Sequence, residues 1–255
     1  MYRRVVRGLS VERLGTGRRL VLIHGFSQTG RSWAGLTADL AGDHEVVLVD
    51  TPGHGGSADL ALDLPGGAEA LVAAAGPGTY VGYSMGGRLA LHAALDHPGA
   101  VERLVLLGAT AGIEDGAERA ARRAADETLA VALERDGLEV FLDRWLSNPL
   151  FAGLPADAAG RDERLRNTVA GLASSLRRAG TGSQADLWPR LGELAMPVLV
   201  VAGEHDAKFR LIGERMARAI GTNATFAVVP GAGHAAHLEA PQAFLALLRG
   251  WFTQV

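Results

Sequence analysis

The chain contains no cysteine among its 255 residues, and Lys208 is its only lysine. The absence of cysteine excludes disulfide bonds and thiolate metal sites. The basic start, residues 1–4, precedes no long apolar run, so the sequence predicts neither a signal peptide nor a membrane span. A formal net charge of −3 gives no electrostatic reason to expect nucleic acid or an anionic membrane as a partner. We therefore expect a cytoplasmic protein, and its oligomeric state stays open.

Short runs of β-branched and apolar residues predict buried strands. Each run is continuous rather than alternating, as expected for strands covered on both faces of a parallel sheet. The runs lie at residues 20–23, 46–49, 79–81, 104–107, 198–201 and 226–229. Helical segments separate most of them, for example residues 88–96, which end at His97-Pro98. This alternation predicts an α/β protein with a mostly parallel, doubly wound sheet.

The pattern changes between Leu107 and Val198, where no strand is evident. A charged amphipathic helix is expected at 114–135, and shorter helical stretches near 138–146 and 161–178. We interpret this interval as a helical cap inserted after the sixth strand of the sheet and returning to it at the seventh. The predicted division is a first core part at 1–110, a cap at 111–185 and a second core part at 186–255.

The segment Gly82-Tyr83-Ser84-Met85-Gly86 follows a predicted strand and matches G-x-S-x-G. In this nucleophile elbow, a sharp strand-to-helix turn exposes the serine hydroxyl at the top of the sheet. Asp206 and His234 each follow a later strand, and the order Ser, Asp, His is typical of α/β-hydrolase triads. We predict that Ser84, Asp206 and His234 form a catalytic triad in which His234 accepts the serine proton. The alternative is three unrelated residues.

His24-Gly25-Phe26 follows the first strong strand, where this fold places part of its oxyanion hole. The backbone N–H groups of Phe26 and Met85 are expected to converge on a developing negative oxygen. Structural roles are favoured for the other candidate histidines, which are His54, His205 and His237.

Several arginines add a feature that a simple esterase does not need. Arg88 lies one helical turn after Ser84, and the cap contributes Arg119, Arg122, Arg123, Arg161, Arg164 and Arg166. Guanidinium groups bind carboxylates in a bidentate manner, so a few that face inward would imply a small polyanionic substrate. Spacing alone cannot select which of the cap arginines do so.

Four stretches closely resemble the menaquinone-pathway lyases called 2-succinyl-6-hydroxy-2,4-cyclohexadiene-1-carboxylate (SHCHC) synthases. They are residues 50–57, 82–88, 203–210 and 232–237. In the cap, Trp145 and residues 148–152 are also similar to that family. The arginine after the elbow and the D-x-K-F-R run at 206–210 are the most specific parts of the resemblance, since many unrelated hydrolases share the triad.

The resemblance implies specific roles for individual residues. It implies carboxylate binding by Arg88, Arg122 and Arg166, and substrate contacts of Trp145 and Tyr83, beside the triad. After Asn167, the chain departs from the family pattern, because Thr168-Val169-Ala170 replaces a more polar stretch. The implied reaction is an elimination that releases pyruvate from a substrate with three carboxylates, without a metal ion or organic cofactor. Whether Ser84 removes the proton or only donates a hydrogen bond stays open.

Two other functions are compatible with the same fold. A serine hydrolase acting on esters or carbon–carbon bonds would form an acyl-enzyme at Ser84 and depend little on Arg88. A binding module that keeps the fold as a receptor is a third possibility, and the intact triad argues against it.

Overall fold

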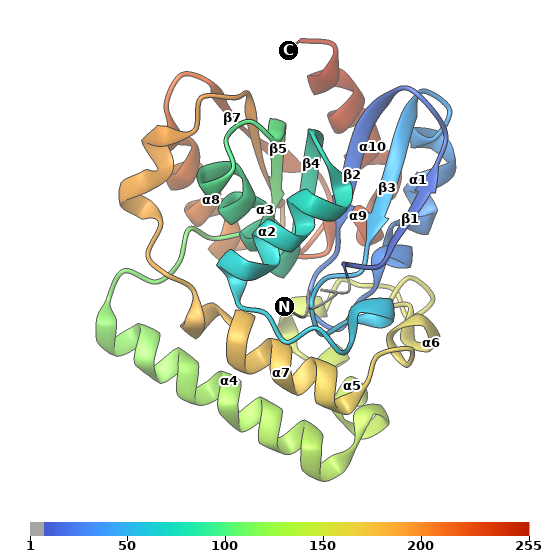
Figure 1. Ribbon diagram of the computed structural model, residues 1–255, viewed down its shortest axis with the longest axis vertical. Coiled ribbons are helices and arrows are strands. Elements are labelled where there is room, and N and C mark those ends of the chain that lie inside the picture. The colour runs from blue at the N-terminus through green and yellow to red at the C-terminus, as the bar shows by residue number, and fades with distance from the viewer. Residues whose placement is uncertain (1–7, 255) are drawn as a thin grey trace, which may run out of the picture.

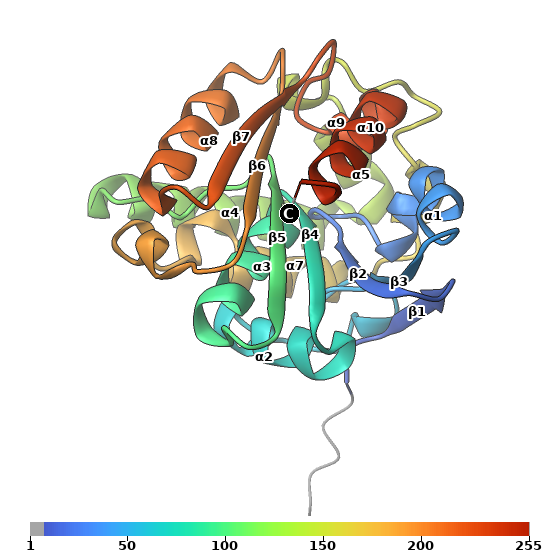
Figure 2. The same ribbon diagram turned by 90° about the horizontal axis from the view of Figure 1, so that it is seen from above.

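The computed structural model describes residues 8–254, which form one seven-stranded sheet in the order β1-β3-β2-β4-β5-β6-β7. Six strands run parallel, and the edge strand β1 pairs antiparallel with β3. Figure 2 shows the sheet twisting across the molecule between two layers of helices. This mostly parallel sheet with helices on both faces is the doubly wound α/β architecture that the sequence predicts. The basic residues 1–4 lie outside the described part of the chain.

All six predicted strands are present, and the sequence reasoning missed β1. Its side chains are only partly buried, so it lacks the continuous apolar run that marks the other strands. The strands are β1 (Val11–Leu14), β2 (Arg18–Ile23), β3 (His44–Val49), β4 (Gly78–Tyr83), β5 (Val101–Leu107), β6 (Val198–Gly203) and β7 (Ala224–Val229).

The core helices are α1 (Ala34–Leu40), α2 (Leu64–Ala75), α3 (Met85–Asp96), α8 (Ala207–Ile220), α9 (Ala236–Glu239) and α10 (Pro241–Phe252). The cap helices are α4 (Gly116–Asp136), α5 (Leu138–Leu146), α6 (Arg161–Arg164) and α7 (Val169–Ala179). Short 3₁₀ helices connect them: η1 (Gly30–Trp33), η2 (Gly55–Ser57), η3 (Pro149–Phe151), η4 (Thr181–Ser183) and η5 (Trp188–Glu193).

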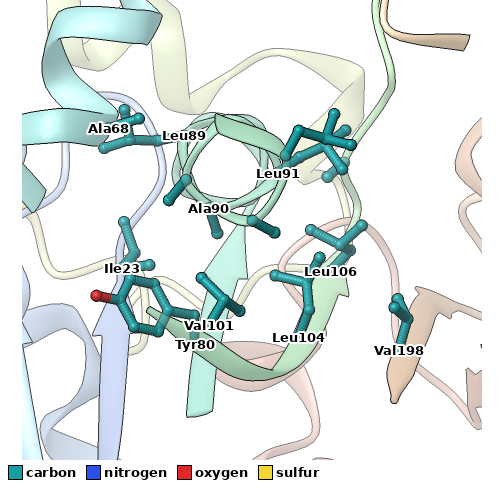
Figure 3. Packing of buried hydrophobic residues seen from close by; sticks show 14 of the residues in the cluster. Ile23, Ala68, Tyr80, Leu89, Ala90, Leu91, Val101, Leu104, Leu106 and Val198 are labelled. Carbon is teal, nitrogen blue, oxygen red and sulfur yellow. The ribbon is translucent and has the colours of Figure 1, made fainter. Parts of the chain in front are cut away.

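Successive residues of the central strands point to opposite faces of the sheet. In β5, Leu104 and Leu106 join the cluster beneath α2, α3 and α8, whereas Val105 and Leu107 join the cluster beneath α1 and α10. Figure 3 shows α3, with Ala90, packed above the strands of the first cluster. Both faces of the sheet are therefore buried, which explains why the strands appear in the sequence as continuous apolar runs.

The cap has its own small hydrophobic cluster, which includes Leu133, Phe141 and Leu172 from α4, α5 and α7. Figure 1 shows these helices gathered at one end of the sheet, with α4 beside α7. The insertion follows β5, which is the fifth strand within residues 8–254, whereas the sequence led us to expect it after the sixth strand. That count required two strands before β2, and residues 8–254 contain only β1 there. Within the same residues, no helix combines the length and apolarity needed to cross a membrane.

Candidate functional site

The turn from β4 to α3 holds Ser84 in a strained backbone conformation. Ser84 has φ 51°, and its amide donates a hydrogen bond of 2.8 Å to the carbonyl of Leu107 at the end of β5. The turn is too tight for side chains at the flanking glycines: a Cβ on Gly82 would lie 2.4 Å from the carbonyl oxygen of Gly86. Such strain is tolerated where the surrounding structure fixes the backbone, and here it presents Ser84 beyond the sheet edge.

Ser84, His234 and Asp206 form one hydrogen-bonded chain. The distance from His234 Nε2 to Ser84 Oγ is 3.2 Å, and the distance from His234 Nδ1 to Asp206 Oδ2 is 2.6 Å. Because a carboxylate oxygen accepts, Nδ1 carries the proton and leaves Nε2 to accept from the serine hydroxyl. The structure thus brings together the three residues predicted to form a triad, in an arrangement able to move a proton from Ser84 to His234.

The start of α8 orients Asp206. Its second carboxylate oxygen accepts a hydrogen bond from the amide of Phe209, so Asp206 is the N-cap of this helix. The ring of Phe209 packs 4.6 Å from the imidazole of His234. One helical turn therefore orients both the acid and the imidazole.

The expected oxyanion-hole residues flank the serine. Met85 is the first residue of α3, so its amide has no acceptor within the helix. Phe26 lies in the loop after β2, next to Ser27, which has a strained φ of 65°. The amide of Ser27 donates to His54 Nε2, and its carbonyl accepts from Asn167 Nδ2 at 2.9 Å. This loop, which carries the predicted oxyanion amide of Phe26, is therefore held rigidly.

Buried histidines support the same loop in their neutral form. Burial lowers the pKa of His24 to about 4 and that of His54 to about 3. His24 Nε2 accepts from the amide of Thr51 at 3.0 Å, and His54 Nε2 accepts from Ser27 at 3.2 Å. An imidazolium could not accept these bonds, so both rings act as fixed acceptors. This geometry agrees with the structural role that the sequence favoured for His54.

Two adjacent cavities meet at Ser84. The inner chamber, about 170 Å³, lies between the sheet and the cap. Aromatic side chains line it together with Arg164: Phe26, Tyr83, Trp145, Phe151 and Phe209. The outer chamber, about 470 Å³, opens between the start of α4 and α8. Both chambers are lined by the same six residues at their junction: Ser84, Arg88, Arg122, Thr181, Lys208 and Phe209.

Arg88 and Arg122 reach both chambers. Arg88 is almost fully buried, and its Nη1 donates to the carbonyl of Ala179 at 2.8 Å. Burial, with the nearby charge of Arg122, lowers the pKa of Arg88 to about 10. Arg122 donates from Nε to the buried carboxylate of Asp126 at 2.8 Å. The structure brings both predicted arginines to the serine, and Asp126 offsets the charge of one of them.

Arg166 does not line either chamber, contrary to the sequence prediction. Its side chain is 58% exposed and pairs with Glu163 at 3.4 Å. Arg164 occupies the inner chamber instead and is 3% exposed. It donates to the carbonyls of Ala159 and Phe26 and to the hydroxyl of Ser27. No local pattern in the sequence distinguishes Arg164 from Arg166, because the contacts of Arg164 with Phe26 and Ser27 join distant parts of the chain.

Trp145 and Tyr83 both line the inner chamber, and their contacts with substrate stay a prediction. The ring of Trp145 packs 5.1 Å from Phe26, and its indole N–H has no hydrogen-bond partner within residues 8–254. Tyr83 packs 5.3 Å from the ring of His234. Burial raises the pKa of the Tyr83 phenol, so the group is neutral.

Among the described residues, no group of three or more acidic or histidine side chains is arranged to hold a metal ion. The polar side chains at the junction are those of Ser84 and Thr181 and three cations, Arg88, Arg122 and Lys208, whereas His234 and Arg164 line the inner chamber but not the outer one.

Comparison with known proteins adds to this geometry. Residues 20–247 match the Alpha/beta hydrolase family. A Klebsiella pneumoniae protein named SHCHC synthase is 36% identical over 241 residues, which cover 90% of this chain and 91% of the relative. A Serratia proteamaculans protein of the same name is 34% identical and matches 91% and 92% of the two chains. The chain belongs to the SHCHC synthase family.

A solved structure supports this family assignment. The structure of MenH from S. aureus superposes with a TM-score of 0.89 at 30% identity, over 98% of this chain and 99% of the other. The enol-lactonase of Burkholderia xenovorans, at 24% identity and a TM-score of 0.79, shows the shared fold alone. The structural similarity that supports membership of the SHCHC synthase family therefore extends over almost the whole chain, including the cap.

Proposed function

We propose that this protein is a lyase of menaquinone biosynthesis that eliminates pyruvate from 2-succinyl-5-enolpyruvyl-6-hydroxy-3-cyclohexene-1-carboxylate. Its product would be 2-succinyl-6-hydroxy-2,4-cyclohexadiene-1-carboxylate, the compound for which the relatives are named. The observation that carries the proposal is the pair of buried arginines, Arg88 and Arg164, that line a chamber beside Ser84. A hydrolase of simple esters has no use for such cations, whereas a tricarboxylate needs them.

The elimination can be written with the residues at hand. Ser84, with His234 accepting its proton, removes the hydrogen from the ring carbon that bears the succinyl ketone. The electrons of that C–H bond form a new ring double bond, the existing double bond shifts by one position, and the C–O bond to the enolpyruvyl group breaks. The departing enolate takes up a proton and becomes pyruvate. The amides of Phe26 and Met85 would stabilise the oxygen of the succinyl ketone while it carries negative charge.

The site geometry supports this order of events. The Ser84 hydroxyl and the His234 imidazole are within hydrogen-bonding distance, which general base catalysis requires. Asp206 stabilises the imidazolium that forms when the proton arrives. Arg88 and Arg164 supply positive charge for substrate carboxylates inside a largely apolar chamber, where charge pairs are stronger than in water.

The test measures pyruvate release from freshly prepared enolpyruvyl substrate. Because this substrate also loses pyruvate spontaneously, the quantity of interest is the acceleration over the buffer rate. We expect a large acceleration by the wild-type enzyme and a loss of at least about a hundredfold in Ser84→Ala, since the base is removed. Release at the buffer rate by the wild type would refute the lyase function.

The alternative is a serine hydrolase, which the hydrogen-bonded Ser84, His234 and Asp206 would also suit. It predicts brisk cleavage of a p-nitrophenyl ester with an acyl group on Ser84. Mass spectrometry of the enzyme during ester turnover would detect that adduct. The lyase proposal expects poor ester turnover in the preparation that accelerates pyruvate release.

The cellular setting remains part of the proposal. A small polycarboxylate is the proposed substrate, and the cytoplasm is the proposed location. The relatives named above are bacterial and carry the name of a synthase. The predicted independence from nucleic acid and from cofactors stays a prediction.

A further inference from the structure

Lys208 is the one lysine of the chain, and the function proposed above gives it no role. It is the second residue of α8, directly after the turn that orients Asp206. Its side chain lines both chambers, and its ammonium lies 5.8 Å from the ring centre of Phe209, which in turn packs on His234. Lys208 is therefore a cation close to the reacting groups.

Lys208 differs from the three arginines of the site because its ammonium faces an aromatic ring, that of Phe209, rather than a hydrogen-bond acceptor. Within residues 8–254, it makes neither an ion pair nor a hydrogen bond. Arg88 donates to Ala179, Arg122 pairs with Asp126, and Arg164 is held by the loop at Ser27. The guanidinium groups are thus held in place by the protein, whereas the ammonium of Lys208 ends a flexible chain and can follow a ligand.

The charges of the inner chamber can be compared with those of the proposed substrate. Four cations and the carboxylate of Asp126 line it, so three positive charges remain while His234 is neutral. The proposed substrate carries three carboxylates. Without Lys208, two positive charges remain, which equals the two carboxylates of the ring product. The net count equals the three carboxylates, and Lys208 is the cation that no hydrogen bond or ion pair within residues 8–254 holds in place, so its charge is available to the carboxylate that leaves with pyruvate.

The position of Lys208 is consistent with binding of the carboxylate of the leaving group. Arg164 lines the inner chamber but not the outer one, whereas Lys208, like Arg88 and Arg122, faces both. Of these three cations, Arg88 and Arg122 are already held by Ala179 and Asp126. Exposed residues at the start of the cap, including Glu114 and Glu118, form the far wall of the outer chamber. The outer chamber is therefore the solvent side of the site.

We infer that Lys208 binds the carboxylate of the enolpyruvyl group and holds this leaving group in the outer chamber, while the ring and its two remaining carboxylates occupy the inner chamber. The inference rests on the proposed lyase function. It makes Lys208 a binding residue that distinguishes the substrate from the ring product.

The experiment compares substrate and product in the same variants. Lys208→Gln removes the charge, Lys208→Arg keeps it, and Arg218→Gln removes a charge from the exposed far end of the same helix as a matched control. We expect Lys208→Gln to lower kcat/KM for pyruvate release by about 10- to 100-fold, mainly through KM, as for the loss of a charge-assisted hydrogen bond. The inhibition constant of the cyclohexadiene product should change less than about twofold, and Lys208→Arg should keep most of the activity.

Each other result overturns the inference. Equal weakening of substrate and product would mean that Lys208 binds a carboxylate retained on the ring. An unchanged kcat/KM in Lys208→Gln, or a similar loss in Arg218→Gln, would mean that Lys208 makes no specific contact. Failure of the lyase function is distinct, because it shows in the wild type as release at the buffer rate, and it would remove this inference as well.

The single lysine allows a second test that requires no change at position 208. In Ser84→Ala, acetylation by an amine-selective reagent is followed at the Lys208 peptide by mass spectrometry. Intact substrate, added just before the reagent, should slow acetylation at least about fivefold, because a carboxylate covers the ammonium. The ring product should slow it much less, and equal protection by both would contradict the assignment.

Discussion

Arg164 and Arg166 lie two positions apart and meet entirely different surroundings. Arg164 is buried against the loop that holds Phe26, and Arg166 pairs in solvent with Glu163. Helix α6, which ends at Arg164, has only four residues. So short a helix has no hydrophobic periodicity from which to assign its inward face. The family resemblance predicted a carboxylate-binding arginine at position 166, two residues from Arg164. Only the packing of the cap on the sheet determines which of these two arginines faces the inner chamber.

Substitution of these two arginines by glutamine forms a matched pair. We expect Arg164→Gln to reduce kcat/KM for pyruvate release at least about tenfold and to lower the free energy of unfolding by about 2–4 kcal/mol. The hydroxyl of Ser27 and the carbonyls of Phe26 and Ala159 would lose their donor.

Arg166→Gln should leave the rate unchanged and the free energy of unfolding within about 0.5 kcal/mol, because its ion pair is exposed. Steady-state kinetics and urea unfolding measure the two effects. Equal losses in both variants would contradict the geometry.

At the scale of elements, the link between β4 and α3 is decided by backbone crowding. The chain passes from a buried strand into a helix with no loop, and Ser84 occupies the single residue between them. A Cβ on Gly86 would lie 2.3 Å from the carbonyl oxygen of Ile23 on the neighbouring strand. Part of this crowding is local, since a Cβ on Gly82 would lie 2.4 Å from the carbonyl oxygen of Gly86, and the G-x-S-x-G motif therefore marks the turn in the sequence.

Gly86→Ala should destabilise the protein strongly. The new methyl group would collide with the backbone of Ile23 and His24, which cannot move without disrupting β2, so we expect a loss of about 3 kcal/mol or more. Gly250→Ala is the matched control, since Gly250 is an exposed residue of α10 and its Cβ would meet nothing within 4 Å.

The control substitution should stabilise the protein by about 0.5–1 kcal/mol through helix propensity. Urea unfolding monitored by circular dichroism gives both values. If Gly86→Ala left the free energy of unfolding unchanged, the backbone at the elbow would be less crowded than the structure indicates.

The cap helices were predicted from the sequence with different success. The long helix α4 and the short α5 match the expected positions closely, because each carries a clear amphipathic pattern. The stretch at 161–178 is two helices instead, α6 and α7, since Thr168 is the N-cap of α7 and accepts a hydrogen bond from Gly171. The division into core and cap at 111–185 stays a prediction.

Across the whole molecule, the end of the sheet that carries Ser84 is also where neutral histidines are buried. His237 lies 4.3 Å from the ring of Trp33 and 4.4 Å from that of Tyr83, without a hydrogen-bond partner in residues 8–254. Burial, together with the charges of Arg164 and His234, lowers the pKa of His237 to about 3. These rings stay neutral in the folded protein while the unfolded chain takes up protons near pH 6.5.

Acid should therefore destabilise the fold in a defined window. Below about pH 6.5, the unfolded state binds more protons than the native state, so stability falls as the pH drops toward the folded pKa values of about 3 to 4. We expect His237→Phe, which retains an aromatic ring against Trp33 and Tyr83, to reduce this slope by up to about 1.4 kcal/mol per pH unit.

Urea unfolding at several pH values from 7 to 4 measures the slope for both proteins. Above pH 7, the two should differ by a constant amount. Parallel curves over the whole range would show that His237 does not contribute to the acid sensitivity.

The sequence by itself determined the features that depend on neighbouring residues. Continuous apolar runs specify strands buried on both faces, the glycines of the elbow specify the turn at Ser84, and the order Ser84, Asp206, His234 follows the strand order. The tertiary structure alone decided that Arg164 rather than Arg166 enters the inner chamber and that Lys208 faces two chambers. The physical reason is that these contacts join segments far apart in the chain. Their side-chain directions follow from packing of the cap on the sheet, and no local pattern encodes that packing.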